Sequence, residues 1–512
     1  MSSRAVKKLY GDKLDIEPVS FSESEVESDT EHGAKPNPFA LLGGGADDDS
    51  ESDEEPEPHP EPKSEEPDKS PSPASQKPSS KSKNKKKKKK AKKVKDQSSQ
   101  GKADDKVGSN VDEDMELLNQ LASSSISAEA GTKIDTRYLD YERELGQLFG
   151  KDAMADAESV ATSSLFPPIK HKMASWGGRD GRTIPGTNRR LILAKIKSTF
   201  PPMLRREIMM ETVKPNVFKF THSESYQQCE RTYLALRTVG DPQAIINSVF
   251  PHSYYHVQTL LMLAEDFVRA GQHSEAADLV ERCLVTFDRA IKPSFDLGKS
   301  RLPFKYYENR QFYLTLFRHV KVLMRRGTWR TALEVVKLMW SLDEKDPYGA
   351  GRLVDFFALN SAEYDYLLSL PTEDYPNIAY SQALAGYLKK EQDSEVVQRL
   401  EKAVKQCPAI AHELLSLELP EVGPRDTVLA KMYGVQMQAL WQPQSTILNM
   451  LHQVLAKVGD IHSEPRKVNK DLARFVLLSE LKEALSILPE EYLSNLWSDD
   501  LLPPDDDINP YN

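Results

Sequence analysis

Apolar positions in the C-terminal part of the chain recur with the period of an amphipathic helix. Between residues 254 and 287 they form two groups separated by Gly271. Spacings of three and four residues within each group predict two helices joined by a tight turn. The first face consists of Tyr254, Val257, Leu261, Ala264 and Val268, and the second of Ala276, Leu279, Val280, Cys283, Leu284 and Phe287.

The same helix-turn-helix unit recurs further along the chain. Gly327 and Ala332 repeat the positions of Gly271 and Ala276, 56 residues later. Small residues at such positions let paired helices approach closely, as in tetratricopeptide-like repeats. Because the usual period is about 34 residues, an insertion at residues 291–307 is expected to interrupt the array.

Further helical pairs are predicted over residues 348–370 and 378–406, and less regularly over 446–458 and 471–488. Few runs favour strands. The predicted fold is therefore all-α, an irregular α-solenoid of tetratricopeptide type over residues 216–497, in which each pair buries its apolar face on the next.

The first 168 residues have the composition of a disordered, charged arm. Residues 81–95 hold eleven lysines and no acid, shortly after the acidic residues 47–68, so the net charge of −10 hides two opposed blocks. The lysine block is a nuclear or nucleolar address, a contact for RNA or the ribosome, or a solubilising run. The candidate polyanion-binding residues in it are Lys85, Lys86, Lys87, Lys88, Lys89, Lys90, Lys92 and Lys93.

A second basic stretch lies in the predicted linker, residues 169–215, where glycines and Trp176 are interleaved with cations. This pattern suits flexible RNA contact, and equally a linker laid over the folded domain. Its candidate polyanion-binding residues are Arg179, Arg182, Arg189 and Arg190.

Apolar and aromatic clusters outside the repeats are candidate partner-docking motifs. In the arm, the alternative is residual structure without a role; in the insertion, it is that the aromatic rings close the gap between two repeats. The acidic tail, residues 498–512, is either a short linear motif or a cap. The candidate docking residues are Phe39, Leu41, Leu42, Leu118, Leu121, Phe304, Tyr306, Tyr307 and Arg310.

No pattern typical of catalysis, cofactor binding or a metal site is present. The three cysteines are widely spaced, and His252 and His256 have helical spacing but no third ligand nearby, so satisfied or surface histidines are favoured. No apolar run approaches the roughly 18 residues that span a bilayer. We expect a soluble intracellular protein without enzymatic activity.

Six segments, taken in order, resemble a known eukaryotic family. They include VFKFTHSESYQQC at residues 217–229, RGTWRTALEV at 326–335 and FVLLSELKEA at 475–484. The others are residues 252–261, 278–285 and 307–316, and the likeness returns in the arm at 4–9, 37–42 and the lysine block. The chain resembles the family that includes ribosome quality control complex subunit one and transcription factor twenty-five.

The resemblance implies a non-catalytic adaptor of ribosome-associated quality control. The implied partners are the large ribosomal subunit with its rRNA, a Listerin-type E3 ubiquitin ligase, an NEMF-like subunit, ubiquitin, and the AAA-type segregase valosin-containing protein. The implied location is the cytoplasm, with a nuclear pool. The family's older name implies an alternative, a nuclear transcriptional repressor, although the lysine block lacks a base-reading pattern. A third class, a tetratricopeptide co-chaperone, requires a basic clamp for an acidic peptide.

Overall fold

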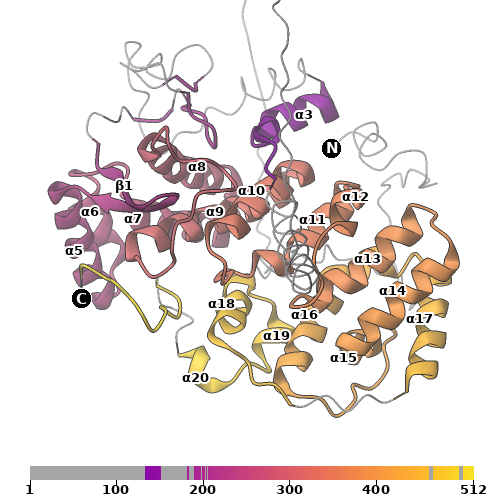
Figure 1. Cartoon of the computed structure of the whole chain (residues 1–512). Helices are drawn as coiled ribbons and strands as arrows, with labels where there is room; N and C mark the ends of the chain where they lie inside the picture. The colour runs from indigo at the N-terminus through magenta and orange to yellow at the C-terminus, as the bar shows by residue number, and fades with distance from the viewer. Residues whose placement is uncertain are drawn as a thin grey trace, which may run out of the picture. The chain divides into compact units, whose positions relative to one another are not determined.

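The computed structural model describes residues 133–150, 181–183, 190–197, 199–201, 203, 206–459, 465–494 and 500–511. Figure 1 shows that this part of the chain is built mainly of helices that follow one another in sequence. The all-α prediction is confirmed. The predicted arm residues before 133 lie outside the described part, as do Arg179 and Arg189.

The predicted helix pairs occur where the apolar pattern placed them. The first comprises α7 (Val257–Arg269) and α8 (His273–Ala290), and the second α9 (Tyr307–Arg326) and α10 (Trp329–Leu342). Gly271 and Gly327 lie between the helices with φ of 72° and 70°, a region that glycine enters without strain. Ala276 and Ala332 are buried where the paired helices meet. The repeat alignment of these four positions is therefore confirmed.

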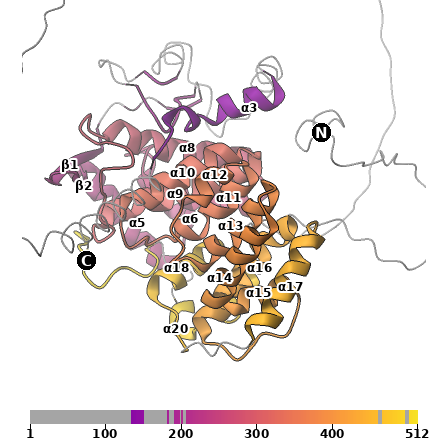
Figure 2. The ribbon, with the colours of Figure 1, turned by 45° about the vertical axis from the view of Figure 1, so that its right-hand side comes forward.

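The array continues with further helices, and successive helices pack on one another as far as α16, whereas α17 packs on α14 and α15 (Figure 2). Their bounds are η4 (Ala350–Arg352), α11 (Val354–Asn360), α12 (Tyr364–Leu368), α13 (Pro376–Leu388), α14 (Asp393–Gln406), α15 (Pro408–Leu414), α16 (Pro424–Trp441), α17 (Ser445–Val458), α18 (Lys470–Ser479), α19 (Lys482–Leu485) and α20 (Glu490–Leu493). One cluster of buried side chains runs from Leu139 to Leu502. Each pair thus contributes to a shared core rather than folding alone.

A two-stranded hairpin precedes the repeats, and the sequence reading did not predict it. Strands β1 (Ile208–Lys214) and β2 (Val217–His222) pair antiparallel, and they lead into α5 (Glu224–Val239) and α6 (Pro242–Val249). Phe220 points inward, with its ring centroid 4.9 Å from that of Phe287 and 5.4 Å from that of Phe312. The hairpin therefore begins within the segment that was assigned to the linker.

Residues 133–150 also belong with the helical domain, earlier in the chain than the predicted end of the arm. They form η3 (Thr136–Tyr138) and α3 (Tyr141–Phe149). The carboxylate of Glu144 accepts hydrogen bonds from the backbone N–H groups of Arg330 and Thr331, at 3.0 and 2.8 Å. These groups open α10, whose N-cap residue Thr328 makes no side-chain cap bond. Because the first N–H groups of a helix lack intrahelical acceptors, Glu144 serves as a distant cap for α10.

The C-terminal segment folds back onto the start of α9. Tyr307 N–H donates to the carbonyl of Ile508 at 3.1 Å, and Ile508 N–H donates to the carbonyl of Lys305 at 2.8 Å. Tyr511 Oη lies 2.6 Å from His222 Nδ1 on β2. Of the two interpretations of the acidic tail, the described residues have the geometry of a cap.

Candidate functional site

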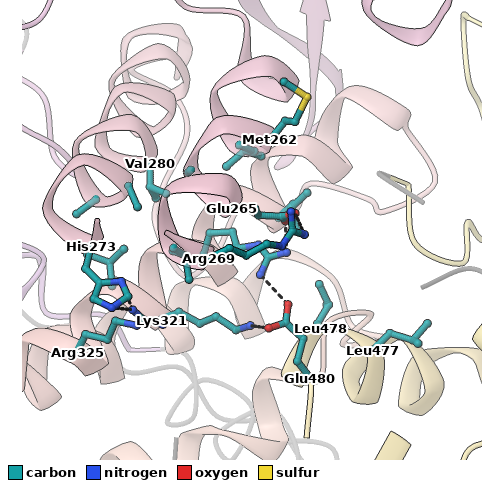
Figure 3. Close-up of a pocket in the computed structure, with 18 of the residues that line it drawn as sticks. Met262, Glu265, Arg269, His273, Val280, Lys321, Arg325, Leu477, Leu478 and Glu480 are labelled. Carbon is teal, nitrogen blue, oxygen red and sulfur yellow. Dashed lines mark hydrogen bonds and ion pairs between the residues drawn. The ribbon is translucent and has the colours of Figure 1, made fainter. Parts of the chain in front are cut away.

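One hollow in the described part of the chain is a groove of about 660 Å³, lined by three helices and one turn. Helices α7, α8 and α9 form its walls, and the end of α18 with the start of α19 closes it (Figure 3). Pockets that hold ligands commonly have volumes of about 300–1,000 Å³. The groove is therefore large enough to take several side chains of a partner.

Helix periodicity explains why charged side chains gather on one wall. Arg318, Lys321 and Arg325 lie at positions i, i+3 and i+7 of α9, which place them on one face. Val322, on the same face, adds an apolar side chain between them. The opposite side of α9 is buried in the core, where Leu316 and Leu323 have no exposed surface.

The groove combines an aliphatic lining with a cationic surface. Among the described residues that line it, seven are arginine or lysine and two are glutamate. The cations are Arg237, Arg269, Arg318, Lys321, Arg325, Arg326 and Lys482. The apolar lining comes from Leu261, Met262, Ala264, Val268, Ala276, Ala277, Val280, Leu314, Val322, Leu477, Leu478, Leu485 and Leu501.

The two glutamates are engaged by cations of the groove. Glu480 lies 3.2 Å from Arg318 Nη1 and 3.2 Å from Lys321 Nζ, and Glu265 pairs with Arg318 and, at 3.7 Å, with Arg269. Burial acts to raise the pKa of Glu480, but Lys321 and Arg318 outweigh it and lower that pKa. Glu480 is therefore ionised at neutral pH.

The backbone of Glu480 is in a conformation that non-glycine residues seldom adopt. Its φ is 60°, at the C-cap of α18. A left-handed conformation costs a residue with a Cβ atom roughly 1–2 kcal/mol. Its carboxylate nevertheless forms ion pairs with Arg318 and Lys321, which link the turn to the cationic wall.

Cations on the rim of the groove are not all balanced by carboxylates. Arg325 donates to the imidazole of His273, with Nη1 2.8 Å from Nε2. Burial and the adjacent Arg325 lower the pKa of His273, so the imidazole is neutral and leaves the arginine charge in place. Within the described ranges no carboxylate forms a salt bridge with Arg325 or Lys482, and both side chains are exposed.

The predicted docking residues of the insertion are mostly internal. Phe304, Tyr307 and Arg310 are 5%, 3% and 3% exposed, and Tyr306 is partly exposed. The Phe304 ring packs on Tyr313 and Tyr348, each at 5.5 Å between centroids. These contacts correspond to the alternative in which the aromatic rings close the gap between repeats. Phe39, Leu41, Leu42, Leu118 and Leu121 lie outside the described residues.

The described part of the basic linker lies on the helical domain. Arg182 pairs with Asp140 at 3.1 Å and donates to the carbonyl of Ile192 at 3.2 Å. The carboxylate of Asp288 in α8 accepts from the N–H groups of Ile192 and Leu193, both at 2.6 Å. Arg190 is exposed and pairs with Thr183 through the backbone. Lys85, Lys86, Lys87, Lys88, Lys89, Lys90, Lys92, Lys93, Arg179 and Arg189 lie outside the described residues.

The buried histidines and cysteines have structural surroundings. His256 Nε2 lies 2.9 Å from the carboxylate of Glu230, and both side chains are fully buried. Burial raises the pKa of the Cys283 thiol and raises that of Cys407 to about 12, which disfavours the thiolate. No group of three metal-ligating side chains occurs in the described part of the chain. Nor is any helix described there long and apolar enough to cross a bilayer.

Comparison with known proteins assigns the helical repeats, and strand β2 before them, to one family. Residues 218–504 match the family model described as transcriptional repressor TCF25. The chain belongs to this family. A fission yeast relative, ribosome quality control complex subunit 1, is 26% identical over 72% of the chain and 59% of its own length. Mouse and human proteins named ribosome quality control complex subunit TCF25 are 31% and 29% identical.

The aligned region spans 62% of the chain and 55% of the mouse protein, and 81% of the chain and 68% of the human protein. The chain therefore spans less than two thirds of the fission yeast protein, 59%, and of the mouse protein, 55%. No solved structure matches the chain.

Proposed function

We propose that the chain is a non-catalytic adaptor subunit of the ribosome-associated quality control complex. The observation that carries the proposal is the family match together with relatives named as subunits of that complex in fission yeast, mouse and human. A helical-repeat scaffold is suited to such a role because its inserted segments and grooves hold partners in fixed positions.

In this proposal the protein acts on large ribosomal subunits that carry a stalled nascent chain. It works beside a Listerin-type E3 ubiquitin ligase and an NEMF-like subunit, promotes ubiquitination of the stalled chain, and favours its extraction by valosin-containing protein for degradation by the proteasome. The protein supplies orientation rather than chemistry, since holding ligase, ubiquitin and substrate together raises the rate of transfer. Its working location is the cytoplasm, with a nuclear pool.

The lysine block supplies the salt-sensitive part of ribosome contact. Residues 81–95 carry eleven lysines, and lysines that neutralise phosphates release condensed counterions. A tethered arm of this kind raises the effective concentration of the folded domain near rRNA. It adds affinity without sequence specificity.

A nuclear transcriptional repressor is the second candidate, because the family model carries that description. In this case the lysine block acts as a nuclear address.

Affinity purification of the tagged protein, followed by sucrose-gradient fractionation and mass spectrometry, separates the two candidates. The adaptor role predicts recovery in large-subunit fractions together with the ligase, ubiquitin and the segregase. A matched variant with the eight candidate lysines at 85–90, 92 and 93 replaced by glutamine should leave those fractions at lower salt than the native chain. Recovery with chromatin and corepressors, free of ribosomal proteins, would exclude the adaptor role and favour the repressor.

A further inference from the structure

We propose that the groove between α7, α8, α9 and the α18–α19 turn binds an acidic, leucine-rich peptide segment of a partner protein. The inference goes beyond the proposed function, because it assigns a ligand class to one surface and holds whether or not the protein acts on ribosomes. It also supplies what a tetratricopeptide-type clamp requires, namely a cationic groove in a helical array.

The shape and lining of the groove favour a peptide that carries aliphatic side chains. A volume of about 660 Å³ takes several side chains at once, and the walls are parts of three separate helices. Val268 on α7, Val280 on α8 and Val322 on α9 give each wall an aliphatic contact. Leucine side chains of a bound segment would remove this surface from water, which is the main source of affinity in grooves of this type.

The charge of the groove favours acidic groups between those aliphatic side chains. Seven cations and two carboxylates are present among the described lining residues. Arg269 and Arg326 also pair with Asp266 and Glu281 outside the lining, at 2.9 and 2.8 Å, so the excess positive charge of the groove is smaller than this count and includes Arg325 and Lys482. Glu480 shows how a carboxylate is held here, since it contacts Arg318 and Lys321 at 3.2 Å each. Arg325 and Lys482 are exposed on the α9 and α19 sides of the groove and form no salt bridge among the described residues. Carboxylates of a ligand would repeat the Glu480 arrangement at these two cations.

The same lining disfavours a single-stranded nucleic acid. Proteins that bind single strands stack bases on aromatic rings. Among the described residues that line the groove none is phenylalanine, tyrosine or tryptophan. A cationic surface with an aliphatic rather than aromatic lining therefore selects the peptide.

The test measures binding of a fluorescein-labelled synthetic peptide, in which pairs of leucine alternate with pairs of glutamate, to the full chain by fluorescence anisotropy. A charge-matched peptide with every leucine replaced by serine controls for the lysine block, which would bind both peptides alike. The groove variant is Arg325→Glu with Lys482→Glu. Its matched control is Lys402→Glu with Lys467→Glu, two exposed lysines that do not line the groove.

The proposal predicts that the leucine peptide binds more tightly than the serine peptide. It also predicts that the double variant Arg325→Glu with Lys482→Glu binds the leucine peptide about tenfold or more weakly, because two attractive contacts become repulsive. The Lys402→Glu and Lys467→Glu variant should bind as the native chain does. Val268→Asn should weaken binding to a similar extent at low and high salt, since it changes apolar contact and not charge. Circular dichroism and thermal melting of each variant confirm that it is folded.

Three results would overturn the proposal. The first is equal binding of the leucine and serine peptides, and the second is unchanged binding in the folded Arg325→Glu and Lys482→Glu variant; both would place the peptide outside the groove. The third is that a uridine oligonucleotide displaces the leucine peptide and that the groove variant no longer binds this oligonucleotide. This result would make the groove a nucleic-acid site.

Discussion

Arg310 joins the C-terminal segment to the repeats, and its replacement tests whether that segment is part of the fold. Its guanidinium is 3% exposed and makes a bidentate contact with Asp500, with both distances 2.7 Å, and a third bond to Asp507 at 2.7 Å. The two aspartates are about one fifth exposed. The cation is therefore far more deeply buried than its partners.

This asymmetry predicts that removing the two carboxylates destabilises the fold more than removing the arginine does. Asp500→Asn with Asp507→Asn leaves a buried cation unpaired, which costs about 3–5 kcal/mol in free energy of unfolding. Arg310→Met leaves two carboxylates that already reach water, and its aliphatic chain retains much of the packing, so its cost is about 1–2 kcal/mol. For a domain of this size, each kcal/mol corresponds to roughly 2–4 °C in melting temperature.

Differential scanning calorimetry of both variants measures this difference, with Asp505→Asn as the control because Asp505 pairs only with the exposed Lys470 among the described contacts. Hydrogen exchange at the amide of Ile508 reports whether the segment detaches, in which case Arg310 gains water and the loss in melting temperature is smaller. The reasoning is refuted if Arg310→Met lowers the melting temperature as much as the double asparagine variant does. It is equally refuted if native melting and native exchange persist in the double asparagine variant.

Further predictions concern three other residues, Glu144, Lys321 and Phe304. Glu144→Ala should lower the free energy of unfolding by about 1–2 kcal/mol and speed amide exchange at Arg330 and Thr331, because α10 loses its distant cap. Unchanged exchange at these two amides would show that α3 does not dock on α10. Burial and Arg318 lower the pKa of Lys321 to about 8, although Glu480 and Glu265 act to raise it. Lys321 therefore loses its charge between pH 7 and 9, and the affinity of the groove for the leucine peptide should fall over this range. In the Lys321→Met variant the affinity should no longer depend on pH in this way. Since this pKa lies below the ordinary 10.5, the unfolded chain holds more protons between pH 8 and 10.5, and this lysine's contribution to the unfolding free energy should rise with pH in that window. Replacing Phe304 with alanine should lower the melting temperature as a core truncation of about 3–5 kcal/mol does, and a native melting curve would instead mark the ring as a surface contact.

The repeats could be predicted from the sequence because their signals are local. The apolar spacing in α7 to α10 and the glycines at 271 and 327 lie within one helix pair each, so periodicity and turn chemistry suffice. The hairpin was missed because β2 has only six residues, too few for its alternating pattern to stand out from the helices that follow. Helices α15 and α16 were missed because their apolar residues do not lie on one narrow face; both helices are largely buried.

The groove lay beyond sequence reading for a different reason. The cations of α9 are visible as a face at 318, 321 and 325, but a charged helical face is most often simply solvated. What makes this face a wall is the turn at Glu480, which is more than 150 residues later and carries the two ion pairs to Arg318 and Lys321. No spacing rule connects those positions; only the packing of α18 against the earlier repeats does.

The groove and the lysine block place two different kinds of recognition in one chain. In its proposed role the lysine block supplies charge without base contacts, so its affinity would depend steeply on salt and would differ little between polyanions. The groove has cations arranged around an aliphatic lining, so the proposed ligand would have to match both and would lose affinity if either were removed. If both proposals hold, an adaptor that reaches a large polyanionic particle and then selects one protein on it would use this division: the unspecific contact would raise local concentration, and the groove would decide which partner is retained.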